Sequence, residues 1–187
     1  NRTVFYARGK YWGNAGVPHS AHMQVSYPET FAYEHGGEFG VMSWPIYDGV
    51  DMRNPNNVPT PVGLEPKNVR EAFFAYYDED RRFGLVHWAD ATETPGKKYW
   101  TWGASAHTAH RAHWFGDGED FLELQSARME DQEEYEIIPP FALKRWRERW
   151  YPIRDIGIVS AAGSSAAMSC RETEGCLRVG IHAAERL

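Results

Sequence analysis

The chain is rich in tryptophan, and several of these residues lie beside carboxylates or histidines. The residues concerned are Trp44, Trp88, Trp100, Trp102, Trp114, Trp146 and Trp150. A pyranose ring offers C–H faces that stack on an indole, and hydroxyl groups that bind charged or amide side chains. We therefore predict a domain that recognises carbohydrate. The alternative is that at least half of these tryptophans fill the interior of a β-sheet protein.

The segment 84–90, GLVHWAD, combines an indole with an acid and an imidazole. Successive side chains of a strand alternate between its two faces, so Trp88 and Asp90 share one face and His87 lies on the other. Trp88 and Asp90 are then placed to grip one ligand, with Asp90 as a catalytic carboxylate and His87 as a proton donor or hydroxyl ligand. The alternative interpretation is that Asp90 merely starts the turn before Pro95.

The segment 95–103, PGKKYWTWG, supplies a turn followed by a strand. In that strand Lys98, Trp100 and Trp102 share one face, which gives two indoles and an ammonium group along one surface. We predict that all three bind substrate. Alternatively, paired tryptophans on a strand fill the core of a sandwich.

The acid-rich segment 121–136 is typical of two strands joined by a turn. In the first strand Glu123 and Gln125 share a face, and the leucines between them point toward a core. Glu123 is predicted to be a catalytic base or a hydroxyl-binding carboxylate, and Gln125 a substrate ligand; a solvated outer face is the alternative. A second carboxylate from residues 131–134, about 5–9 Å from Glu123, would suit hydrolysis of a glycosidic bond.

Histidines supply further candidates for proton transfer. His107, His110 and His113 have a spacing that resembles metal ligation from a helix, but no acidic partner follows at the expected offset. We therefore predict no metal site, and we predict no cofactor because the chain has no glycine-rich phosphate loop or nucleophile motif. His35 is predicted to bind substrate or donate a proton.

The composition argues against nucleic acid or a membrane as a partner. The chain of 187 residues has a formal net charge of −6, and its basic residues are scattered except at 144–149. No apolar run approaches the ~20 residues of a transmembrane helix. Cys170 and Cys176 are too few for a disulfide framework, which favours reduced thiols in a cytoplasmic protein, although one disulfide between them is the alternative.

Short runs of alternating, β-branched and aromatic residues must position these side chains. We expect strands over residues 4–12, 23–27, 41–46, 72–77, 82–88, 98–102, 121–127, 134–138, 144–151, 156–162 and 176–181. Residues 48–67, dense in Asn, Pro and Gly, are expected to form a long excursion. This spacing favours an all-β antiparallel sandwich formed by residues 1–187 as a single domain, which we expect to be truncated at both ends.

An ordered series of motifs resembles a bacterial protein family. The motifs are YWGNAGVPHS, EHGGEFGVMSWPIYDGVD, GLVHWADATETPGKKYWTWG, FLELQSARMEDQEEYEIIPPF and WRERWYPIRDIG, which together span residues 11–157. Members of that uncharacterised family are large proteins with a galactose-mutarotase-like β-supersandwich, commonly followed by tetratricopeptide repeats. The resemblance implies stacked antiparallel sheets, a role in sugar metabolism and protein partners bound by repeats outside this chain. It carries over no catalytic residues, and fold alone does not fix activity.

These observations leave three hypotheses for function. The first is a carbohydrate-active domain that performs acid–base chemistry on a glycoside or aldose, as a glycoside hydrolase or an epimerase does. Glu123 and Asp90 would be its carboxylates and His87 or His35 its proton donor, while Trp44, Trp100 and Trp102 would form the stacking surface. The second is a non-catalytic carbohydrate-binding or scaffolding domain of a repeat-containing protein. The third is a purely structural part of a sandwich.

Overall fold

The structure is a computed structural model of the chain. It describes residues 5–8, 13–18, 21–29, 31–34, 40–67, 69–103, 121–130, 132 and 134–185. In this part of the chain almost all regular structure is β, and the strand pairings are antiparallel. The structure thus confirms the predicted all-β antiparallel class.

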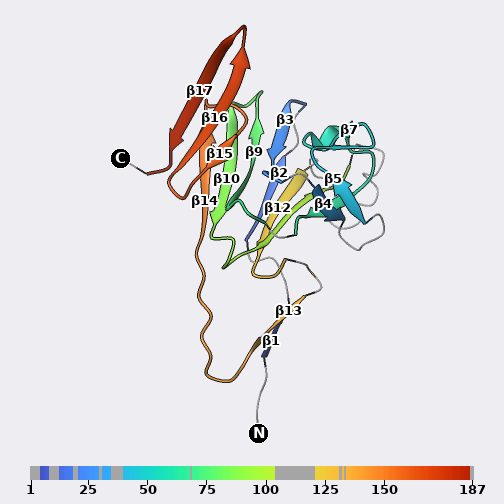
Figure 1. Cartoon of the computed structure of the whole chain (residues 1–187), viewed down its shortest axis with the longest axis vertical. Coiled ribbons are helices and arrows are strands. Elements are labelled where there is room, and N and C mark those ends of the chain that lie inside the picture. The colour runs from blue at the N-terminus through green and yellow to red at the C-terminus, as the bar shows by residue number, and fades with distance from the viewer. Residues whose placement is uncertain are drawn as a thin grey trace.

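Three sheets stack as layers (Figure 1). The middle layer has four strands, in the order β14 (Glu148–Arg154), β10 (Phe83–Ala89), β9 (Phe73–Asp78) and β3 (Met23–Ser26). On one side lies a sheet of six strands, in the order β2 (Gly13–Pro18), β12 (Phe121–Ala127), β11 (Gly96–Thr101), β8 (Val62–Glu65), β4 (Phe31–Glu34) and β5 (Val41–Ser43). On the other side lies a sheet of three strands, β15 (Ala161–Ala162), β16 (Ala166–Thr173) and β17 (Cys176–Ala183).

Smaller elements connect these layers. Two short ladders pair β1 (Phe5–Arg8) with β13 (Tyr135–Ile138), and β6 (Ile46–Tyr47) with β7 (Val50–Asp51). The 3-10 helix η1 (Pro55–Asn57) begins with proline, and the side chain of Asn54 caps it by accepting a hydrogen bond from the Asn56 N–H. Among the described residues no helix is long and apolar enough to cross a membrane.

The middle layer is buried on both faces, and strand β9 shows why. All six of its residues, FFAYYD, are buried, as expected for a nearly continuous apolar strand covered on two sides. Phe74 and Tyr76 pack into the inner core, between the middle and six-stranded sheets. Phe73, Ala75 and Tyr77 pack into a second core toward the three-stranded sheet. A large apolar side chain buried in this way contributes roughly 1.5–3 kcal/mol to the free energy of unfolding. The side chains of β9 therefore stabilise the packing of the middle layer against both neighbouring sheets.

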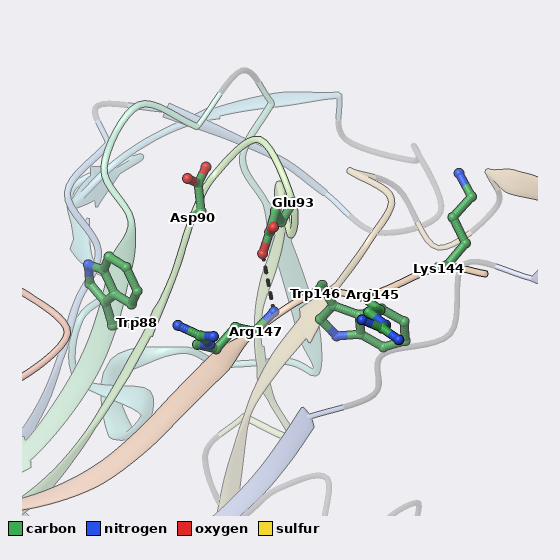
Figure 2. A pocket seen from close by; sticks show the side chains of 7 residues that line it. All are labelled: Trp88, Asp90, Glu93, Lys144, Arg145, Trp146 and Arg147. Carbon is green, nitrogen blue, oxygen red and sulfur yellow. Dashed lines mark hydrogen bonds between the residues drawn. The ribbon is translucent and has the colours of Figure 1, made fainter.

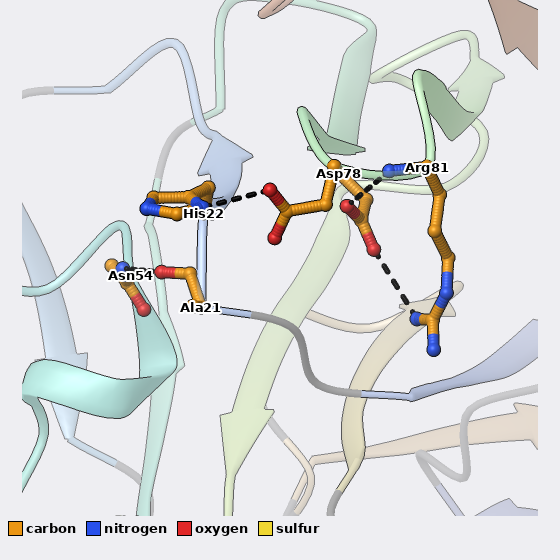
Figure 3. Close-up of polar contacts among 6 residues, drawn as sticks. Ala21, His22, Asn54, Asp78 and Arg81 are labelled. Carbon is orange, nitrogen blue, oxygen red and sulfur yellow. Dashed lines mark hydrogen bonds and ion pairs between the residues drawn. The ribbon is translucent and has the colours of Figure 1, made fainter.

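Polar contacts fasten the edge of this stack (Figure 3). The buried carboxylate of Asp78, at the end of β9, accepts hydrogen bonds from the backbone N–H of Arg81 at 2.9 Å and from its guanidinium group at 3.2 Å. Asn54 donates a hydrogen bond from its side chain to the carbonyl oxygen of Ala21 at 3.0 Å. The turn after β9 and the chain entering β3 are therefore held by side chains from neighbouring segments.

The predicted excursion over residues 48–67 is wrong in part, because it contains a central strand. Strand β8 (Val62–Glu65) lies between β11 and β4 in the six-stranded sheet, and all four of its residues are buried. Prolines at 61 and 66 flank a run of only four residues, so the local signal is one of turns. Pairing with β11 and β4 overrides that signal.

Other strands differ from the prediction in position. Strand β12 has the predicted bounds, whereas β14 begins at Glu148 rather than at residue 144. Strands β2, β4 and β16 were not predicted, because their sequences contain glycine, alanine or acidic residues that favour no strand by themselves. The expected strand 156–162 is reduced to β15 (Ala161–Ala162).

Candidate functional site

The six-stranded sheet carries a cluster of polar and aromatic side chains on the side opposite the inner core. Its members, which we call the outer face, are Glu65, Lys98, Trp100, Trp102, Glu123 and Gln125. In the antiparallel ladder of β11 and β12, Lys98 is opposite Gln125 and Trp100 is opposite Glu123. Their sequence neighbours Tyr99, Leu122 and Leu124 are fully buried in the inner core. Side chains along the two strands therefore alternate between the inner core and the outer face, as predicted.

Glu123 is held in place from two directions. The indole Nε1 of Trp102 donates to its Oε1 at 3.3 Å, and Nε2 of Gln125 donates to its Oε2 at 2.6 Å. Hydrogen bonds to both oxygens fix the orientation of the carboxylate on the sheet. A carboxylate positioned in this way can accept further hydrogen bonds from ligand hydroxyl groups.

Lys98 and Glu65 form a buried ion pair on the same face. Lys98 Nζ lies 3.7 Å from Glu65 Oε1 and donates to Gln132 Oε1 at 2.8 Å. Only 4% of the Lys98 side chain and 3% of the Glu65 side chain are exposed. Because charges taken out of water are costly unless paired, each of these two groups depends on the other.

The two indoles of the outer face do not form one flat platform. Their ring centroids are 5.3 Å apart with an angle of 71° between the planes, an edge-to-face contact. The ammonium group of Lys98 lies 4.9 Å from the centroid of the Trp100 ring, which occupies one face of that ring. Both residues are half-buried, so a ligand would meet two rings in different orientations.

Trp88 and Asp90 lie elsewhere, in a pocket of about 700 Å³ beyond the end of β10 (Figure 2). Asp90 Oδ1 accepts hydrogen bonds from the Thr92 N–H at 2.8 Å and from its hydroxyl at 2.7 Å. These bonds lower the pKa of Asp90. Asp90 thus starts the turn after β10, as the alternative interpretation held, and it does not join Glu123 at one site.

His87 is in the inner core and not at a ligand site. It is 0% exposed, and its ring lies 4.8 Å from that of Phe74 and 4.6 Å from that of Trp150. Burial lowers the pKa of His87 to about 4, so the imidazole is neutral at pH 7, and its Nε2 lies 3.2 Å from Glu148 Oε2. The prediction of His87 as a proton donor to a ligand is therefore wrong, because the strand turns it into the sandwich.

The Glu148 carboxylate reaches into the same interior. Burial by itself would raise the pKa of Glu148, but hydrogen bonds with His87 and Trp146 hold it below its usual value. Lys97 is also 1% exposed, and burial lowers its pKa to about 8. The sequence did not indicate this internal polar cluster, because Glu148 lies 61 residues along the chain from His87 and only the pairing of β10 with β14 brings the two together.

Trp44 is likewise a core residue. It is 6% exposed, its Nε1 donates to the carbonyl oxygen of Tyr27 at 2.9 Å, and it makes edge-to-face contacts with the rings of Tyr27 and Tyr99. This placement gives no support to the prediction that Trp44 stacks on a ligand, and the general alternative that many tryptophans fill the core applies to it.

Several candidates are not covered by the structural description. His35, the triplet His107, His110 and His113, and two acids of the 131–134 segment lie outside the described residues. Within the described part of the chain no group of three or more His, Cys, Asp or Glu side chains is arranged to hold a metal ion. Cys170 and Cys176 are both exposed free thiols.

Sequence reasoning missed Glu65 and the role of Gln132. Glu65 ends strand β8, which was expected to be part of the long excursion, and its acidity alone gave no reason to place it beside Lys98. Gln132 follows β12 in a turn and reaches Lys98 across the sheet. Only the pairing of β8 with β11 brings these groups together.

Two comparisons place the chain among known proteins. It is similar to a crystal structure described as that of a TPR-domain containing protein from Parabacteroides distasonis ATCC 8503, with a TM-score of 0.64 and 23% identity over 87% of this chain. This chain spans 29% of the length of that protein, and a likeness at this identity shows a shared fold. The motifs had predicted relatives that carry such repeats. The family model of a domain of unknown function, DUF5107, matches residues 2–153, so the chain belongs to the DUF5107 family.

Proposed function

We propose that this chain is a carbohydrate-binding domain whose outer face binds the sugar. The observation that carries the proposal is the convergence of Trp100, Trp102, Glu123 and Gln125 on one side of a sheet whose other side is the core. These side chains offer what a pyranose requires: aromatic area for C–H faces and fixed acceptors and donors for hydroxyl groups.

The wider context of the proposal is a galactose-mutarotase-like β-supersandwich in a cytoplasmic protein of sugar metabolism. Stacked open antiparallel sheets support that architecture. Tetratricopeptide repeats elsewhere in the full protein would bind protein partners; the similar structure is described as that of a TPR-domain containing protein. The residues proposed to bind the sugar all belong to this chain.

Titration calorimetry with a panel of neutral mono- and oligosaccharides tests the proposal. Trp102→Ala should weaken binding of the best saccharide by roughly tenfold or more, because a stacked aromatic contact contributes on the order of 1 kcal/mol and its hydrogen bond to Glu123 is lost as well. Trp44→Phe, a change at a core indole, is the matched control and should leave the affinity of the folded protein unchanged. Absence of binding across the panel would contradict the proposal.

A second candidate function is acid–base catalysis on a glycoside or aldose at the same face. The observation that favours it is the presence of two carboxylates, Glu123 and Glu65, with the ammonium group of Lys98 on one surface. Glu123→Gln should then abolish turnover and largely spare binding, since the amide keeps the shape but not the basicity of the carboxylate. Full turnover in that variant would exclude Glu123 from the chemistry. Asp90 and His87 have no part in this candidate, because they lie elsewhere.

A further inference from the structure

The pocket beyond β10, which we call the Trp88 pocket, is equipped for a different ligand from that of the outer face. It is lined by Trp88, Asp90, Glu93, Lys144, Arg145, Trp146 and Arg147 (Figure 2). Its volume of about 700 Å³ lies within the range of small-molecule sites. None of these residues belongs to the outer face, so the pocket is a separate site.

Strand register explains how Trp88 and Arg147 meet. In the ladder of β10 and β14, Trp88 is opposite Arg149 and Ala89 is opposite Glu148. Alternation puts Arg147 on the same face as Arg149, and one further step of the register brings it beside Asp90. Figure 2 shows the side chain of Arg147 between the indoles of Trp88 and Trp146.

The pocket contains cationic groups that the protein itself does not neutralise. Lys144 is paired, since its Nζ lies 2.5 Å from Glu136 Oε1. Arg145 and Arg147 are exposed, and among the described residues neither guanidinium group has a hydrogen bond or ion pair. Guanidinium groups are always charged and form paired hydrogen bonds with carboxylates and other planar anions.

In contrast to the two guanidinium groups, the two carboxylates of the pocket already accept hydrogen bonds from the protein. Asp90 accepts two hydrogen bonds from Thr92, and Glu93 Oε2 accepts the backbone N–H of Arg147 at 3.1 Å. The pocket therefore has more free donors than free acceptors, and its ligand should be rich in acceptors.

Of the two indoles, Trp88 is the one available for stacking. Trp146 donates from Nε1 to Glu148 Oε1 at 2.9 Å, and the guanidinium of Arg128 lies 5.5 Å from the centroid of its ring. Trp88 is half-buried against the second core and presents the remainder of its ring to the pocket.

We propose that the Trp88 pocket binds an acidic saccharide of the uronate class. The pyranose ring of one unit stacks on Trp88 and its carboxylate pairs with the guanidinium group of Arg147, while the carboxylate of a neighbouring unit pairs with that of Arg145. The free oxygens of Asp90 and Glu93 accept hydrogen bonds from ring hydroxyls. The inference extends the proposed function to a charged class of sugar, but it rests on residues that the outer face does not use.

Calorimetric titration of the 187-residue chain with a galacturonate trisaccharide, and with a galactose trisaccharide of the same linkage, tests this proposal. The double variant Arg145→Gln, Arg147→Gln should lose roughly tenfold or more of its affinity for the galacturonate, because two charge-assisted contacts are removed. Binding should also weaken as salt is raised. Arg178→Gln on β17, an equal change of charge per site on another surface, should have no effect, and Trp102→Ala should leave this affinity unchanged.

Several results would overturn the proposal. The first is absence of galacturonate binding by the unaltered chain, and the second is equal loss of affinity in the Arg178→Gln control. The third is an affinity for inorganic sulfate or phosphate as high as that for the galacturonate, which would make the pocket a general anion site. Loss of galacturonate binding in Trp102→Ala alone would instead assign this ligand to the outer face. If neutral sugars do not bind the outer face, the proposed function fails, but galacturonate should still bind the Trp88 pocket.

Discussion

The ion pair of Lys98 and Glu65 illustrates how much a single residue on the outer face depends on its partner. Both side chains are almost fully buried, although they lie on the side of the sheet away from the inner core. At such a site the energy of a charge is set by its counter-ion and hydrogen bonds and not by water. The same pair also places an ammonium group against Trp100, so removing Lys98 would change the surroundings of that indole as well.

Replacement of Lys98 by methionine should destabilise the protein by about 3 kcal/mol, because the Glu65 carboxylate loses its buried counter-ion. Adding Glu65→Leu to Lys98→Met should restore part of that loss, since the remaining charge is removed too. Urea unfolding of the single and double variants measures both effects. Arg82→Met is the matched control: Arg82 and Asp155 pair at 2.9 Å, but their side chains are 68% and 61% exposed. That change should alter stability by about 0.5 kcal/mol or less. Equal effects at the two pairs would show that burial does not strengthen the Lys98 pair.

At the scale of elements, strand β10 depends on close approach to both of its neighbours. It pairs with β9 on one side and β14 on the other, and carries Trp88 and His87 toward opposite cores. Gly84 lies near its start, where a Cβ atom would come within 2.2 Å of the carbonyl oxygen of Tyr76. A backbone atom cannot move aside as the end of a flexible side chain can, so the strand accepts no side chain there.

Gly84→Ala should therefore destabilise the protein by about 3 kcal/mol, as overpacking in a tightly packed interior does. Gly163→Ala is the comparison: the nearest atom to a Cβ at Gly163 is 4.0 Å away, and its φ lies outside the left-handed region. That substitution should be neutral or stabilise by up to about 1 kcal/mol, through a smaller loss of backbone entropy. Thermal unfolding of the two variants compares them directly. A Gly84→Ala protein as stable as the parent would mean that β9 and β10 lie farther apart than described.

At the scale of the whole molecule, the layered stack encloses polar groups that must stay in one protonation state. His87 is neutral, lies between the middle and six-stranded sheets, and contacts the Glu148 carboxylate. Because Nε2 donates to that carboxylate, Nδ1 is the unprotonated nitrogen, and it has no partner among the described residues. Protonation of this ring adds a further charge to an interior that already holds Glu148 and Lys97, and favours unfolding.

The free energy of unfolding should consequently decrease at acid pH, over a pH range set by the two pKa values of His87. Its folded pKa of about 4 lies below the unfolded value of about 6.5, so the unfolded chain binds the proton first and stability falls as the pH drops from 6.5 toward 4. The expected loss is on the order of 2–3 kcal/mol between pH 7 and pH 4.5. Urea unfolding at a series of pH values should show this slope, and His87→Gln should flatten it.

His22 provides a control, because its pKa shifts in the opposite direction on folding. Its ring Nδ1 lies 2.8 Å from Asp80 Oδ1 at the surface, and the hydrogen bond and charge of Asp80 raise its pKa. Stabilisation by this pair is present below the unfolded pKa and is lost as the pH rises through the folded value. His22→Gln should therefore leave the acid-side slope in place. If His87→Gln and His22→Gln changed that slope alike, His87 would not be its source.

The sequence by itself determined the class of the fold and the two sides of β11 and β12. Alternation in KKYWT and FLELQSA is enough to separate Lys98, Trp100, Glu123 and Gln125 from the buried residues between them, because the period of a strand is a local property. The strand that carries Glu65 could not be found in this way, since four residues between prolines give no local signal.

Only the tertiary structure decided which candidates share a site. Trp44 and His87 belong to residue types common in binding sites, yet sheet packing buries both in the inner core. Asp90 and Glu123 are the same kind of group in the sequence, but Asp90 follows β10 of the middle layer and Glu123 lies within β12 of the six-stranded sheet, so they face different surroundings. Local patterns fix which way a side chain points from its own strand; which sheets pack against that side depends on contacts between segments far apart in the sequence.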